Sequence, residues 1–190
     1  MQYLVSFALL VAFVAWMVGV YNNLCHLRGA VCNCWGQWRK VTHHRNECLN
    51  DFAAAFALFM PQGDPLPDSL RRMVADSERS LALLSREPRW GSLHGFVGGA
   101  EHLLRLAVAR SVQTVEDSPA MRAHEHLQRL CSGVAVSLYQ QDQVTNLFNR
   151  AAVEYNTALA QPSARLLAPV FGFSRADPLT FSETQSPRSS

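Results

Sequence analysis

Seven histidines and five cysteines give this 190-residue chain its greatest capacity for metal chemistry. His44 and Cys48 lie four residues apart, so on a helix they share one face. Cys32 and Cys34 lie two apart, and a helix would point them about 200° from each other. A structural zinc site needs two paired ligand units, of the kind Cys-x₂₋₄-Cys or His-x₃₋₅-His. The chain offers one mixed unit and no second of clear spacing, so we predict no metal and no cofactor.

Catalytic motifs of the common kinds are absent from the sequence. It holds no Gly-x-Ser-x-Gly, and the pair Gly98-Gly99 has neither a preceding strand pattern nor a following lysine. The net charge of +2 is small for a nucleic-acid-binding protein. The chain is 48% hydrophobic and 17% charged, which indicates a folded protein with one modest domain. We therefore predict neither an enzyme, nor a nucleic-acid binder, nor a small-molecule substrate.

An uncharged apolar segment runs from Tyr3 to Tyr21, with Leu10 near its middle. Its nineteen residues would form a helix of about 28 Å, close to the ~30 Å hydrocarbon core of a bilayer. Tyr3, Trp16 and Tyr21 lie near its ends, where amphipathic rings suit the headgroup region. No small-x-small cleavage signal follows the segment, so we predict a retained transmembrane anchor over residues 1–21. A buried helix of a soluble core is the alternative, and nineteen uncharged residues are long for one.

Basic residues follow this segment and none precedes it. Arg28, Arg39, Lys40 and Arg45 stand against one acid, Glu47, in the stretch up to residue 50. The positive-inside rule therefore predicts an N-terminus outside and a cytoplasmic domain after the span. The odd number of cysteines, without a disulfide spacing, agrees with a reducing compartment.

Apolar residues then recur every three or four positions as far as Phe59, the period of an amphipathic helix. Pro61, Gly63 and Pro162 are the strong breakers, and we expect residues 88–99, rich in glycine, to be an irregular connection. Two long and two shorter helices with turn-rich joins predict an all-α, antiparallel four-helix bundle. The polar tail from Ser174 to Ser190, with two prolines, is predicted to be disordered. We expect the helices at about 3–60, 64–86, 99–115 and 118–160.

Three patches of the sequence, in order and spacing, resemble the bacterial LemA family over about residues 3–173. The first patch directly follows the apolar segment, the second opens the last long helix, and the third lies near the end of that helix and just beyond it. The residues that carry the resemblance are Tyr21, Asn22, Leu27, Arg28, Val31, Trp35, Gln37 and Arg45, then Pro119, then Phe148, Asn149, Tyr155, Asn156, Phe171, Gly172 and Phe173.

The resemblance implies a single-pass protein of the bacterial inner membrane, with a LemA-like bundle over residues 22–173 and no established enzymatic activity. We predict a membrane-anchored scaffold that binds a protein partner or a copy of itself. The alternative is a signalling adaptor or sensor that transmits a change through the long first helix. Trp35 and Tyr155 should be buried where the first and last long helices pair, and the amides of Asn22 and Asn156 should bond across helices.

Overall fold

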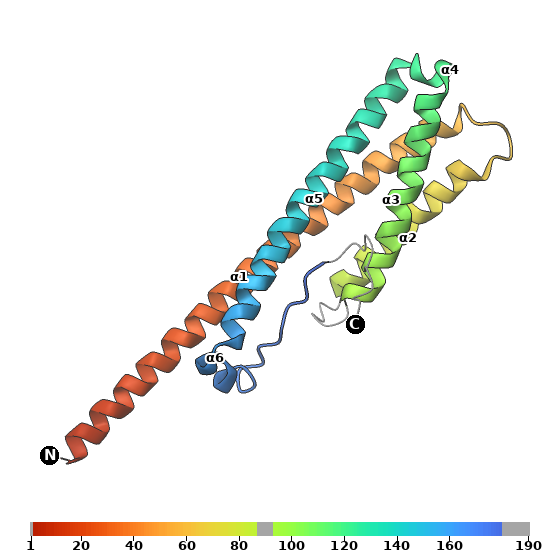
Figure 1. Ribbon diagram of the computed structural model, residues 1–190. Helices are drawn as coiled ribbons and strands as arrows, with labels where there is room; N and C mark the ends of the chain where they lie inside the picture. Colours follow the sequence, from red (N-terminus) through yellow and green to blue (C-terminus); the bar gives the residue numbers. More distant parts are fainter. Residues whose placement is uncertain (1, 87–92, 180–190) are drawn as a thin grey trace, which may run out of the picture.

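The computed structural model describes residues 2–86 and 93–179, and the side-chain surroundings of 3–83 and 99–179. Every regular element in these residues is a helix, as predicted, and the four long ones form an antiparallel bundle with a short helix at each end (Figure 1). The elements are α1 (Gln2–Ala57), α2 (Pro65–Arg86), α3 (Leu93–Asp117), α4 (Pro119–Arg122), α5 (Glu125–Ala160) and α6 (Pro162–Leu167).

Helix α1 is continuous over 56 residues, about 84 Å, and its first part projects beyond the bundle (Figure 1). The side chains of residues 3–16 are all exposed. This helix is long and apolar enough to cross a bilayer, a property that it shares with signal sequences. It ends before a turn in which Gly63 has a φ of +90°, a conformation that side chains disfavour. Asp64 then accepts a hydrogen bond from the Leu66 amide at 2.9 Å, as a cap of α2 does.

The single helix predicted over 118–160 is wrong, because α4 and α5 are separate helices. Ser118 caps α4, with its hydroxyl accepting from the Met121 amide at 3.5 Å. His124 has extended backbone angles, and its ring Nδ1 accepts from the Leu127 amide at 3.4 Å. A histidine that caps a new helix is therefore what interrupts the old one.

The glycine-rich stretch is also more helical than predicted, since α3 begins at Leu93 and includes Gly98 and Gly99. Each glycine costs a helix roughly 1 kcal/mol relative to alanine, but helix propensity is readily overridden by tertiary packing. Here α3 packs along α2. Residues 88–92 of the predicted connection lie outside the described residues.

Two apolar clusters form the core, and α1 and α5 contribute to both. The cluster nearer the N-terminal end of α1 contains Trp35, 8% exposed, and Tyr155, 3% exposed. The far cluster brings Phe52 together with Leu127. The predicted antiparallel pairing of the first and last long helices is thus confirmed along their shared length.

The predicted disorder of the tail does not extend to residues 174–179. This extended segment runs back along the bundle (Figure 1), and Ala176 and Leu179 are buried in the cluster with Trp35. Two asparagines of α5 hold its main chain, as described below. Residues 180–190 lie outside the described residues.

Candidate functional site

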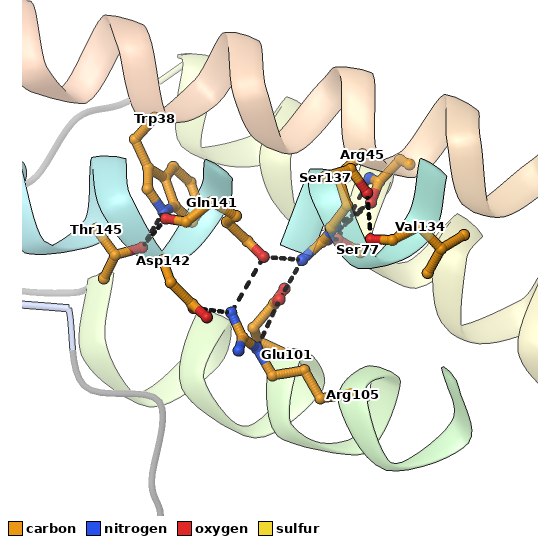
Figure 2. A network of polar contacts seen from close by, with 11 residues as sticks. Trp38, Arg45, Ser77, Glu101, Arg105, Val134, Ser137, Gln141, Asp142 and Thr145 are labelled. Atoms are coloured by element: carbon orange, nitrogen blue, oxygen red, sulfur yellow. Dashed lines mark hydrogen bonds and ion pairs between the residues drawn. The ribbon is translucent and has the colours of Figure 1, made fainter. Parts of the chain in front are cut away.

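A polar network crosses the middle of the bundle, and Arg45 of α1 is its centre (Figure 2). A guanidinium has five N–H groups, and each one of Arg45 meets an acceptor. Nε donates to Asn46 Oδ1 at 3.2 Å, and Nη2 donates to Asn46 Oδ1 at 2.7 Å and to Ser77 Oγ at 3.0 Å. Nη1 donates to Gln141 Oε1 at 2.6 Å and to the Glu101 carboxylate. Arg45 therefore connects all four long helices.

Charges of alternating sign continue from Arg45 towards the surface. Glu101, 3% exposed in its side chain, pairs with Arg45 and lies 3.6 Å from Arg105 Nε. Arg105 Nη2 donates to Asp142 Oδ1 at 2.6 Å, and Asp142 is half-exposed. Two positive and two negative side chains thus balance within one chain of contacts (Figure 2).

Burial and charge act in opposite directions on these two arginines. Burial lowers the pKa of Arg45, and the charge of Glu101 opposes that effect. Burial also acts to lower the pKa of Arg105, but the hydrogen bond and charge of Asp142 outweigh it and raise that pKa. Both side chains stay cationic at any physiological pH.

Sequence reasoning singled out Arg45 but missed its acceptors. A usable signal existed in the apolar periodicity. Glu101 precedes Leu104 and Val108 at the spacing of one buried helix face, and Gln141 lies midway between the buried Val134 and Phe148. A charged or amide side chain on a core face indicates a buried polar partner on another helix.

The interior beside this network can hold about one water molecule. A cavity of about 10 Å³ lies among side chains of α1, α2 and α3, including Thr42, Ser77 and Glu101. The Thr42 hydroxyl is buried and has no hydrogen-bond partner among the described residues. No organic substrate fits a space of this size.

Among residues 3–83 and 99–179, no three histidine, cysteine or acidic side chains converge as metal ligands would. His44 and Cys48 do share a helix face, with Nε2 and Sγ 3.8 Å apart. Both His43 and His44 approach the Glu47 carboxylate, at 3.6 and 3.5 Å, on the surface of α1. The five cysteines are free thiols.

Aromatic rings fill the seam between α1 and α5. Trp35 and Trp38 stack with centroids 4.9 Å apart, and Phe148 lies 5.7 Å from Trp35. The indole of Trp38 donates to Thr145 Oγ1 at 3.1 Å. Burial raises the pKa of Tyr155, which keeps its phenol neutral. These contacts pack the helices, and all four of these rings are buried.

The first and third sequence patches meet where the apolar part of α1 joins the bundle. The Tyr21 ring lies 4.8 Å from the Phe171 ring and 5.8 Å from the Phe173 ring. The guanidinium of Arg28 lies 5.9 Å from the centre of Phe173. Gly172 has a φ of +68°, so the turn that brings both phenylalanines to α1 favours glycine.

Two asparagines of α5 hold the extended segment 174–179 by its main chain. Asn149 Nδ2 donates to the Leu179 carbonyl at 2.9 Å, and the Leu179 amide donates to Asn149 Oδ1 at 2.7 Å. Asn156 Nδ2 donates to the Ala176 carbonyl at 2.5 Å, and the Ala176 amide donates to Asn156 Oδ1 at 2.9 Å. The prediction that Asn156 forms a hydrogen bond across helices is therefore wrong, because its side-chain amide bonds to the main chain of Ala176 instead.

The remaining residues of the three patches occupy ordinary bundle positions. Val31 and Phe148 are buried and Leu27 is half-buried in the core cluster, whereas Asn22 and Gln37 are exposed. Pro119 is exposed at the first turn of α4, a position that tolerates proline.

Comparison with protein families and with curated proteins identifies no relative of this chain. No protein-family model matches the chain, and no curated protein matches it. The resemblance to the LemA family therefore stays a prediction.

Proposed function

We propose that this protein is a membrane-anchored scaffold of the LemA type, which binds a protein partner and performs no turnover. One observation carries the proposal: a single unbroken helix joins an exposed apolar segment to a bundle whose two fully buried charges, Arg45 and Glu101, are paired with each other. The bundle does not bury the side chains of this apolar segment, so we place the segment in a lipid bilayer. Neither the buried network nor its small cavity offers a place for a substrate.

The proposed orientation places the bundle in the cytoplasm of a bacterium and the N-terminus outside. Arg28, Arg39 and Lys40 follow the apolar segment closely enough to count in the positive-inside rule. Arg45 lies too far beyond Tyr21 to count strongly, since the rule applies within about 15–20 residues of the span. A reporter enzyme fused after residue 60 should be active only in its cytoplasmic form, and activity of an export-dependent reporter there would contradict the orientation.

Exposed apolar side chains give the scaffold a surface on which a partner can dock. Leu103 and Leu106 of α3 are each 55% exposed, and Tyr139 of α5 is 65% exposed. A photo-crosslinking amino acid placed at position 106 or 139 of the full chain in intact cells should capture the same partner protein repeatedly. Placed at Leu10, in the proposed span, it should capture lipid or unrelated membrane proteins. Absence of any reproducible partner at the bundle positions would contradict the scaffold.

The signalling adaptor remains the second candidate, since α1 is continuous and could transmit a rotation. Inserting two alanines between Val14 and Ala15 turns the outer part of the helix by about 200° relative to the bundle. Both flanking residues lie outside the apolar clusters of the bundle, so its packing should be unchanged. A scaffold keeps the same crosslinked partners after this insertion, whereas an adaptor changes them.

A further inference from the structure

The extended segment 174–179 is bound to the bundle in the way that a peptide ligand is bound to a receptor. All four of its hydrogen bonds to Asn149 and Asn156 involve its own main-chain N–H and C=O groups. Such bonds supply affinity to any extended chain, and the pockets for its buried side chains then supply specificity. We call Asn149, Asn156 and the apolar cluster around Ala176 and Leu179 the tail site.

The spacing of the two asparagines matches an extended chain. Seven residues of α5 separate Asn149 from Asn156, which is about 10.5 Å along the helix. Three residues separate Ala176 from Leu179, which is about 9–10 Å in an extended backbone. Each asparagine therefore meets one residue of the segment and pairs with both its N–H and its C=O.

Two side chains of the segment are buried in the bundle. Ala176 is 1% exposed and Leu179 is 4% exposed, and both belong to the core cluster with Trp35. Asp177 and Pro178 between them are only partly buried. Neither asparagine accepts a hydrogen bond from the backbone of residue 178, so a proline, which lacks the N–H group, is tolerated there. The proline also biases the residue before it towards an extended backbone.

We propose that the tail site binds extended peptide segments of the form Ala-x-x-Leu, and that residues 174–179 are an intramolecular ligand which such a segment of a partner protein displaces. The proposal rests on the proposed scaffold function, because it names the kind of partner segment that the scaffold takes. Four hydrogen bonds and two buried side chains hold the segment, and residues 168–173 that precede it form no helix or strand. A segment with so few contacts is among the first parts of a fold to open.

The direct test is displacement in the full-length protein, reconstituted in lipid nanodiscs. A synthetic peptide of residues 172–180 is added in excess, and hydrogen exchange is measured at the amides of Ala176 and Leu179. We expect exchange at both amides to rise roughly 3- to 10-fold as the peptide replaces the tail. A control peptide with Leu179→Asp, which would bury a charge, should leave exchange unchanged.

Variants of the asparagines test the receptor side without changing its shape. Asn149→Asp and Asn156→Asp each replace the donor of a hydrogen bond by a carboxylate that repels the segment's carbonyl. We expect exchange of the tail amides to rise roughly 3- to 10-fold in either variant, and fluorescently labelled peptide to bind the doubly substituted protein at least about tenfold more weakly than the unsubstituted protein. Asn146→Asp is the matched control, because Asn146 is exposed on the same helix and makes no bond to the segment.

Several outcomes would overturn the proposal. If the asparagine variants loosen the tail but excess peptide neither displaces it nor binds, the segment is a permanent cover of α5. If the tail exchanges only with the tail of a second copy, seen as crosslinked dimers, the occupant is this chain itself. These measurements use purified protein, so they can succeed or fail independently of the topology and crosslinking tests of the scaffold.

Discussion

Removal of the Arg45 side chain from the network should strongly destabilise the bundle. Arg45→Met keeps a flexible apolar chain of similar length but leaves Glu101 buried with Arg105 as its remaining cation. Gln141 Oε1 and Ser77 Oγ each lose one of two donors and keep only the longer hydrogen bond, at 3.2 and 3.4 Å. Breaking a buried ion pair by removing one partner costs about 3–5 kcal/mol. Because Arg105 Nε stays 3.6 Å from the same carboxylate oxygen, we expect a loss near 3 kcal/mol in the free energy of unfolding.

Substitutions of Glu101 separate the contribution of the buried ion pair to stability from that of side-chain packing. Glu101→Gln preserves the shape but leaves the Arg45 charge without its anion, and it should also cost about 3 kcal/mol. Arg45→Met together with Glu101→Leu removes both charges, so the double variant should lose at least about 2 kcal/mol less than the sum of the single losses.

A surface ion pair provides the control for this cycle. Arg79 and Asp76 of α2 are 2.7 Å apart, but their side chains are 76% and 59% exposed. Replacing either by alanine should change stability by about 0–1 kcal/mol. Urea unfolding of the full-length protein in nanodiscs, followed by tryptophan fluorescence, measures all the variants. The reasoning is refuted if Arg45→Met costs no more than the surface variants, or if the double variant loses the full sum.

Three further predictions concern packing, backbone and thiol chemistry. Tyr155→Ala should cost roughly 3–5 kcal/mol of unfolding free energy because its ring is buried. Tyr139→Ala, on the same helix but 65% exposed, should cost less than about 1 kcal/mol. Equal losses in the same urea assay would contradict the burial of Tyr155 between α1 and α5. Gly172→Ala should cost about 1–2 kcal/mol because its φ is +68°, and limited proteolysis should cut the chain near it faster than in the unsubstituted protein. Burial raises the pKa of Cys131, so less of it is thiolate at pH 8 and it should react with a maleimide more slowly than the exposed Cys32; the reverse order would refute this assignment.

Structural features that depend only on residues close together in the sequence could be predicted from it. The apolar run from Tyr3 to Tyr21 specifies a helix of bilayer length whatever the rest of the chain does. Pro61 and Pro162 end helices because they lack an N–H group, and the three-to-four spacing around Trp35 and Tyr155 identifies which faces are buried. The all-α bundle and the antiparallel pairing of α1 with α5 follow from these local patterns and from the short connections.

Positions at which a helix and a non-helical backbone have similar free energies were harder to predict. A histidine is an uncommon cap, so His124 looked like an ordinary residue of a long helix, yet its ring bonds the Leu127 amide and starts α5. The glycines near Gly98 suggested a loop, yet packing of α3 on α2 overrides their low helix propensity. In both places two backbone conformations differ by about 1 kcal/mol, a margin that one tertiary contact can reverse.

Only the tertiary structure decided which polar groups meet. Arg45 and Glu101 are 56 residues apart in sequence, and the periodicity of each helix shows that both lie on a buried face without showing that they face each other. The tail is the clearest case: its composition is that of a disordered chain, but Asn149 and Asn156 present hydrogen-bonding groups at the spacing of an extended backbone. The amphipathic pattern of one helix specifies which of its faces is buried, but its rotation and register against the other helices depend on every contact between them at once.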